Sequence, residues 1–235
     1  MSAPLTDQQD WQEAIEEQGF AIVPSVLSTR ELIPILVSLA DLEPPRGRAG
    51  IRHVLNHPTV KVVAQNPRLL EMAQAVLGDA AFPFRATLFD KTPETNWLIS
   101  WHQDTALPLQ EKIETSGWGP WSVKENVIYA HAPAAVLENV LALRLHLDDV
   151  TEDGGPLRIL PGTHGLGIIK PEEIERHSTY EQPVECIGAR GAVVAMRPLV
   201  IHASSKSRSQ APRRVLHIEY AASGNLENGL RLALA

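Results

Sequence analysis

The first third of the chain has the apolar periodicity and the end signals of helices. Residues 6–19 open with capping and acidic residues and close at a glycine, which is typical of a helix with a glycine C-cap. Ser28 precedes a second apolar segment, and Glu31 follows it at the spacing of a capping box. The pattern predicts further helices at residues 52–56 and 67–77.

After residue 78 the pattern changes to short apolar segments separated by Gly and Pro, which is typical of strands. Helices followed by strands indicate an α+β fold, mainly β, in which residues 1–78 buttress a sandwich or barrel formed by residues 79–235. No internal repeat or linker interrupts the chain, so we expect residues 1–235 to form a single domain. The predicted strands are residues 20–24, 82–90, 96–102, 141–149, 191–197 and 213–221.

Residues 141–148 alternate leucine with other residues over their whole length. Since successive side chains of a strand face opposite sides, the four leucines share one buried face. The other face carries Ala142, Arg144, His146 and Asp148. This polar face either meets solvent or lines an internal cavity, as in small β-barrels that hold a ligand. The alternation alone does not choose, but the motifs described below favour the cavity.

The composition is that of a soluble, folded domain. Of the 235 residues, 44% are hydrophobic and 21% are charged, which is close to the globular average. The net charge of −7 opposes binding to nucleic acid, and no apolar run approaches the length of a membrane span or a secretory signal. The single cysteine, Cys186, excludes a disulfide scaffold and predicts a cytoplasmic location. We expect a monomer or homodimer.

A candidate metal site begins at the tetrapeptide WHQD, residues 101–104, where His102 and Asp104 are two apart at the end of a predicted strand. An extended backbone points both side chains to one side, and a second histidine would complete a two-histidine, one-carboxylate site for non-haem Fe(II). His202 is preferred because it ends an apolar run shortly before a basic strand. Residue type alone leaves seven other candidates: His53, His57, His131, His146, His164, His177 and His217.

Several motifs together resemble one known family. They are EQGF at residues 17–20, FDKTP at 89–93, WHQD at 101–104, LHLDDVTEDGGPLRILPGTH at 145–164 and HASSKSRSQAPRR at 202–214. With these segments nearly the whole chain resembles the phytanoyl-CoA dioxygenase-like group of Fe(II)- and 2-oxoglutarate-dependent oxygenases. The resemblance implies a double-stranded β-helix, a jelly-roll or cupin-like fold, with the iron in its open mouth.

The resemblance also implies roles for individual residues. His102, Asp104 and His202 would be the iron ligands, and Arg213 would hold the far carboxylate of the cosubstrate 2-oxoglutarate. Ser204 matches a residue that supports the same carboxylate. By strand alternation, Arg214 should face away from this site.

Three further positions correspond less closely to cosubstrate-binding residues of the family. Arg144 falls where the family usually has an aromatic side chain, so we expect it to contact the cosubstrate or, alternatively, the substrate. Thr87 and Lys91 precede WHQD and lie near cosubstrate positions. The implied reaction consumes O2 and 2-oxoglutarate, hydroxylates a small-molecule metabolite and releases succinate and CO2. The presence of Asp104 disfavours halogenation, because related halogenases have a small residue there.

The sequence gives fewer indications of which residues contact the substrate. We expect Gln103 to contact substrate and residues 107–131 to form part of the substrate mouth, with Trp118 and Trp121 as apolar walls. Ordinary packing of a long insertion explains the tryptophans equally well. Basic residues that include Arg46, Arg48 and Arg52 could meet an anionic substrate or simply solvate a loop. The alternative function is a noncatalytic metal-binding jelly roll or a cupin-like isomerase, although the HxH pair of a typical cupin is absent.

Overall fold

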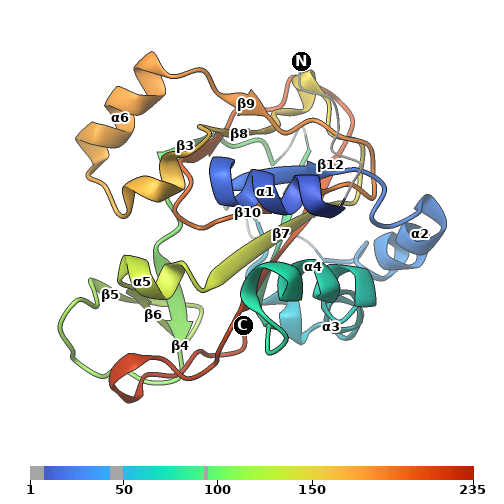
Figure 1. The fold of residues 1–235 in the computed structure, drawn as a ribbon. Helices are drawn as coiled ribbons and strands as arrows, with labels where there is room; N and C mark the ends of the chain where they lie inside the picture. Colours follow the sequence, from blue (N-terminus) through green and yellow to red (C-terminus); the bar gives the residue numbers. More distant parts are fainter. Residues whose placement is uncertain (1–7, 43–49, 93–94) are drawn as a thin grey trace.

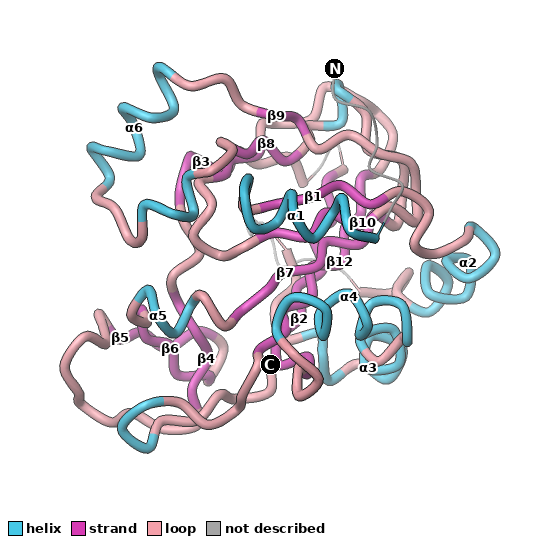
Figure 2. Tube along the Cα trace, in the orientation of Figure 1, coloured by secondary structure: helices cyan, strands magenta, loops and turns pink. Residues whose placement is uncertain are grey.

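The computed structural model of the protein describes residues 8–42, 50–92 and 95–235. Two antiparallel sheets form its centre, and helices cover one face of the larger sheet (Figures 1 and 2). The Pro- and Gly-rich loop with Arg46 and Arg48 lies outside the described residues. None of the described helices combines the length and apolar composition needed to cross a membrane.

Three sheets account for the described strands, and all the pairings within them are antiparallel. The larger sheet has the order β1 (Phe20–Val23), β10 (Val193–Met196), β7 (Val140–His146), β12 (Arg213–Ala221) and β2 (Phe82–Lys91). The smaller sheet has the order β3 (Ile99–His102), β11 (His202–Ser204), β8 (Leu157–Ile159) and β9 (Val184–Glu185). A third sheet consists of β4 (Ala106–Leu109), β6 (Val127–His131) and β5 (Trp121–Lys124).

The helices gather mainly before the first long strand. They are α1 (Gln8–Gln18), α2 (Thr29–Ser38), α3 (Pro58–Ala64) and α4 (Pro67–Leu77), followed later by α5 (Ala134–Leu137) and α6 (Pro171–Tyr180). Short 3-10 turns occur at Val54–Asn56, Glu152–Gly154, Thr163–Leu166 and Glu227–Gly229. The four odd-numbered leucines at positions 141–147 share one core cluster with buried residues of α1, α3 and α4. The helices therefore cover the leucine face of β7.

The opposite face of β7 lies inside the molecule. Arg144 is buried and lines a cavity, and Ala142 and His146 are also buried. Of the two readings of this strand, the one that places its polar face toward an internal cavity is confirmed. The helical buttress and the mainly β remainder are confirmed as well.

The start of helix α2 was predicted accurately because its capping partners lie only three residues apart in the sequence. Ser28 caps α2, because its side chain accepts from the backbone N–H of Glu31 while the Glu31 carboxylate accepts from the backbone N–H of Ser28. The helix predicted at residues 52–56 is wrong in extent. His53 has a left-handed φ of 59°, so only a 3-10 turn forms there, and Pro58 then begins the unpredicted helix α3.

Candidate metal and cosubstrate site

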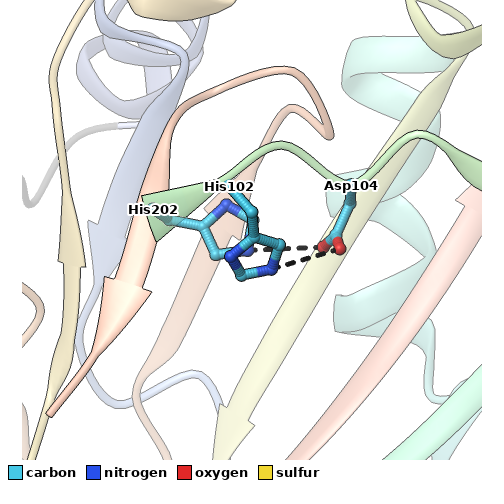
Figure 3. A group of neighbouring side chains, drawn as sticks. All are labelled: His102, Asp104 and His202. Atoms are coloured by element: carbon cyan, nitrogen blue, oxygen red, sulfur yellow. Dashed lines mark ion pairs between the residues drawn. The ribbon is translucent and has the colours of Figure 1, made fainter. Parts of the chain in front are cut away.

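The three predicted metal ligands converge at one end of the smaller sheet. His102 ends β3 and His202 begins β11, and the register pairs them directly across the two strands. Their ring centroids are 4.2 Å apart. The Asp104 carboxylate lies 3.6 Å from Nε2 of His102 and 3.4 Å from Nε2 of His202 (Figure 3). All the potential ligand atoms lie within 4.8 Å of one another, within reach of a single ion.

Backbone carbonyls fix the orientation of both imidazoles. Nδ1 of His102 lies 2.8 Å from the carbonyl oxygen of Ser100, and Nδ1 of His202 lies 2.9 Å from that of Val200. Because a carbonyl oxygen can only accept, each Nδ1 donates to it, and each Nε2 is directed toward Asp104. This arrangement, in which the second ring nitrogen is held by a backbone carbonyl, is the usual support of a metal-binding histidine.

The protonation states also suit a metal ion. Burial and the neighbouring His202 lower the pKa of His102, so its imidazole is neutral near pH 7. Burial alone would raise the pKa of Asp104, but the two imidazoles outweigh it and lower that pKa well below its usual value. Two imidazoles and one carboxylate on one side fit the facial triad of non-haem Fe(II) sites.

A cavity of about 320 Å³ adjoins the triad, and positive charge dominates its lining. The charged residues that line it are Arg52, Arg85, Lys124, Arg144 and Arg213, against Asp104 and Glu219. The whole chain, by contrast, has a net charge of −7. A cavity lined by one sign of charge concentrates ligands of the opposite sign, so this cavity favours anions.

Arg213 is the cation with the least compensation. It is buried and lines the cavity, its Nε has no hydrogen-bond partner, and no carboxylate among the described residues lies within 4.0 Å of its guanidinium. Burial and the nearby Arg144 lower the pKa of Arg213 to about 9. A buried, unpaired guanidinium is costly, and its planar fork matches a carboxylate, so the geometry fits the far end of a dicarboxylate.

Lys91 and Ser204 lie beside Arg213. Lys91 is buried, and its Nζ donates to Oγ of Ser204 at 2.9 Å and to the carbonyl oxygen of Ser205. Burial, Arg213 and Arg144 lower the pKa of Lys91 to about 7. Oγ of Ser204 in turn donates to the carbonyl oxygen of Gly155 at 3.1 Å.

Beside Ser204 and Ser205 the structure leaves no room for a side chain at position 155. Gly155 has a φ of 64°, and a Cβ there would lie 2.4 Å from the carbonyl oxygen of Ser205. A larger residue would therefore displace the chain that carries Ser204 and Ser205. This close approach accounts physically for the GGP sequence at residues 154–156.

Arg144 is held by a histidine rather than by a carboxylate. Its Nη1 donates to Nδ1 of His217 at 3.0 Å, and its guanidinium lies 5.1 Å from the ring centroid of Phe89. Burial and Arg144 lower the pKa of His217 well below its usual value, so the ring is neutral and can accept. Thr87, paired with His217 across β2 and β12, also lines the cavity.

Gln103 lines the cavity, and its side chain is also hydrogen-bonded to distant backbone groups. Its amide nitrogen donates to the carbonyl oxygens of Gly167 and Leu199, each at 2.8 Å, and its Oε1 accepts from the backbone N–H of Ile169 at 3.1 Å. The polar atoms of the side chain are thus already bonded to backbone. An H-x-D sequence motif cannot reveal this, because the partners lie more than 60 residues away.

Trp118 and Trp121 do not form walls of the cavity. Trp118 is buried in an apolar cluster that includes Leu107, and Trp121 packs against the same cluster. Of the two explanations, ordinary packing of the segment fits the positions of both tryptophans, whereas Lys124, Tyr129 and His131 of the same segment line the cavity. Trp97 lines the cavity instead.

Other lining residues were missed at the sequence level. Those on the third sheet, or directly before it, are Thr105, Lys124, Tyr129 and His131. Those on the larger sheet are Arg85, Phe89 and Glu219. The alternation of strands would have indicated the last three. Arg85 and Phe89 share a face with Thr87, and Glu219 shares a face with Arg213.

Comparison with known proteins agrees with this geometry. The family model described as phytanoyl-CoA dioxygenase (PhyH) matches residues 15–215. An L-proline trans-4-hydroxylase from Streptomyces griseoviridis is 28% identical over 180 residues, which cover 66% of this chain and 59% of that protein. The chain thus matches less than two thirds of the length of this relative.

Solved structures share the fold at low sequence identity. The 2-oxoglutarate-dependent carbocyclase SnoK from nogalamycin biosynthesis superposes with a TM-score of 0.72 at 17% identity, covering 100% of this chain and 90% of that one. HygX from Streptomyces hygroscopicus, solved with nickel and 2-oxoglutarate bound, gives a TM-score of 0.69 at 14% identity and coverages of 94% and 90%. These likenesses confirm the double-stranded β-helix. Since the family model spans most of the sequence, the chain belongs to the phytanoyl-CoA dioxygenase (PhyH) family.

Proposed function

We propose that residues 1–235 act as one Fe(II)- and 2-oxoglutarate-dependent dioxygenase domain that hydroxylates a small molecule. The reaction converts substrate, O2 and 2-oxoglutarate into hydroxylated substrate, succinate and CO2. One observation carries the proposal: three oriented ligands adjoin a cavity that contains a buried arginine with no carboxylate partner among the described residues. A metal centre next to a site for a dicarboxylate is what this chemistry requires.

Each residue of the triad has a defined task. Nε2 of His102, Nε2 of His202 and a carboxylate oxygen of Asp104 would hold the ion from one side, and the hydrogen bonds to Ser100 and Val200 keep both lone pairs aimed. Iron held by these residues would supply oxygen activation coupled to the oxidative decarboxylation of 2-oxoglutarate.

The buried cations orient the cosubstrate. Arg213 would receive the far carboxylate of 2-oxoglutarate through two parallel N–H bonds. Lys91 adds positive charge behind Ser204 and holds the chain at Ser205 in place. Arg144, fixed by His217, contributes a second guanidinium to the same end of the cavity, in place of the aromatic side chain expected there.

The substrate is a small molecule on two grounds. The cavity of about 320 Å³ lies at the small end of the range for ligand pockets and must also admit 2-oxoglutarate. The relative from Streptomyces griseoviridis is named for hydroxylation of L-proline, so L-proline is a suitable first compound to test. Most of the atoms of a coenzyme A thioester would have to remain outside the cavity.

The test separates an oxygenase from a noncatalytic metal-binding protein or an isomerase. Protein loaded anaerobically with Fe(II) should develop a visible metal-to-ligand charge-transfer absorption when 2-oxoglutarate is added. Admission of O2 should then release succinate in a quantity matched to hydroxylated product. Absence of both the absorption and the succinate would show that the proposed function is mistaken.

A further inference from the structure

The outer end of the cavity has a charge pattern that the cosubstrate does not explain. We use the name outer subsite for Arg52, Lys124 and Tyr129, which line this end. Tyr129 is buried, and Nζ of Lys124 lies 4.9 Å from its ring centroid. Lys124 itself is exposed, and its ammonium lies over this buried ring at the cavity wall, where a ligand can reach it.

Internal partners account for one cation near this subsite but not for the others. Arg85 is bound through two of its nitrogens by the Glu219 carboxylate, and its Nη1 donates to the carbonyl oxygen of Ala106 at 2.9 Å. Arg52 has only a distant contact, 3.7 Å, with Glu125. Glu125 lies equally far, at 3.7 Å, from Nδ1 of His53, so it is shared.

Lys124 has no carboxylate within 4.0 Å among the described residues. Partial burial, Arg52 and Arg85 lower its pKa, and Asp104 acts in the opposite direction. An anion bound between Lys124 and Arg52 would supply the missing compensation. Such an anion would be held by charge-assisted hydrogen bonds, which are stronger than neutral ones.

This subsite is remote from the site of the cosubstrate carboxylate. Arg213, which lines the cavity, is on β12 of the larger sheet and pairs with Lys91 of β2, whereas Lys124 is on β5 of the third sheet. Arg85, whose charge acts on Lys124, stands six residues before Lys91, which is roughly 20 Å along the backbone of β2 at about 3.3 Å per residue. The Asp104 carboxylate acts electrostatically on both Lys124 and Arg144, so both cations lie in the neighbourhood of the metal ligands.

We propose that Lys124, assisted by Arg52, binds the carboxylate of the primary substrate, and that this substrate is a small carboxylic acid such as an amino acid. The inference rests on the proposed function and specifies the substrate class for the same cavity. It places the two carboxylates of substrate and cosubstrate at opposite ends, with the metal ligands between them. The remainder of a small acid would then extend from the outer subsite toward the triad.

The test uses the full chain loaded with Fe(II) and 2-oxoglutarate, and a panel in which each compound has an uncharged counterpart. The panel contains the common L-amino acids and simple monocarboxylic acids, each paired with its carboxamide. Succinate release after admission of O2 is the readout. At least one acid should stimulate succinate formation while its carboxamide does not at the same concentration.

The variants locate the effect. Lys124→Gln should raise the KM for the stimulating acid about tenfold or more, the loss expected for one charge-assisted bond, and should change kcat far less. Lys124→Arg keeps the charge and should preserve the preference for the acid. Lys112→Gln is the matched control, because Lys112 pairs with Glu114 and lies over Trp121 instead of lining the cavity, and it should behave like the unmodified protein.

The outcomes separate the two proposals. Equal stimulation by acid and carboxamide, an unchanged KM in Lys124→Gln, or no stimulation by any acid while the coloured 2-oxoglutarate complex still forms would each overturn the inference and leave the proposed function intact. Failure of the protein to bind 2-oxoglutarate at all would overturn the proposed function and this inference together.

Discussion

Arg213 and Arg214 are consecutive on β12, and their guanidinium groups have opposite surroundings. Arg214 makes two hydrogen bonds to the Asp148 carboxylate, each at 2.8 Å. Arg213 faces the cavity, where its Nε has no partner. The alternation of the strand thus places one arginine in a structural ion pair and leaves the other available for a ligand.

Substitution of these two arginines should have different consequences. Arg213→Gln should weaken binding of 2-oxoglutarate by about tenfold to a hundredfold or more, because two charge-assisted bonds are lost. Arg214→Gln should leave that affinity within about twofold and instead lower the free energy of unfolding by about 1–3 kcal/mol, since Asp148 loses both hydrogen bonds from the guanidinium and keeps the one from the backbone N–H of residue 214. Calorimetric titration and urea unfolding of both variants provide the measurements. Equal losses of affinity would contradict the assignment of Arg213.

Removal of the carboxylate ligand should eliminate both metal binding and turnover. Asp104→Ala leaves two imidazoles, which hold a divalent ion far less tightly than three ligands do, so hydroxylation should be abolished. Metal content by elemental analysis and product formation are the measurements. Asp149→Ala, which removes a surface carboxylate paired with Arg190, is the control and should retain both. Turnover of Asp104→Ala at the unmodified rate would refute the ligand assignment.

Lys91 should make the affinity for 2-oxoglutarate dependent on pH. Its pKa is lowered to about 7 by burial and by Arg213 and Arg144, and a carboxylate bound to Arg213 would offset their charge and raise this pKa. Below about pH 7, Lys91 is charged in both states and contributes no dependence. Above it, binding takes up a proton, so affinity should fall as pH rises, by at most about tenfold per pH unit.

Calorimetric titrations between about pH 7 and 9, in buffers that differ in ionisation enthalpy, measure this proton uptake directly. Lys91→Met serves as the comparison, since it keeps the length of the side chain without its charge. The variant should show little proton uptake over the same range. Identical uptake in both proteins would exclude Lys91 as its source.

The contact between Arg144 and His217 should contribute to stability through hydrogen bonding. His217→Leu leaves Nη1 of buried Arg144 without its acceptor and should reduce the free energy of unfolding by about 1–3 kcal/mol. His217→Gln retains an acceptor at this position and should recover part of the loss. Urea unfolding of the two variants distinguishes them. A His217→Leu protein as stable as the unmodified one would show that Arg144 finds another partner.

Sequence reasoning succeeded where the information is local. The capping box at Ser28, the bounds of β12 and the two faces of β7 follow from spacing along a single element. The pairing of His102 with Asp104 is of the same kind, because two residues of an extended segment share a side. His202 was preferred because it ends an apolar run before a basic strand, and the family resemblance implied the same residue, whereas residue type alone left seven other histidines open.

The features that sequence reasoning did not predict depend on contacts between residues far apart in the chain. The sheet within residues 107–131 arises because β6 pairs with both β4 and β5, and short exposed strands of this kind have no distinctive periodicity. Its core takes up Trp118 and Trp121, while the same sheet turns Lys124 and Tyr129 toward the cavity. The hydrogen bonds of Gln103 could not be predicted for a similar reason, since its amide is bonded to residues 64–96 positions away.

The sequence by itself determined which residues could carry the chemistry, because side-chain type and strand alternation are properties of each segment alone. Only the tertiary structure decided which of them meet. Strand register brings His102 opposite His202, and the packing of one sheet against another determines whether a buried arginine finds a carboxylate. Such pairings depend on contacts between residues far apart in the chain, and these contacts separate the two neighbouring arginines of β12 into one that stabilises the fold and one that faces the cavity.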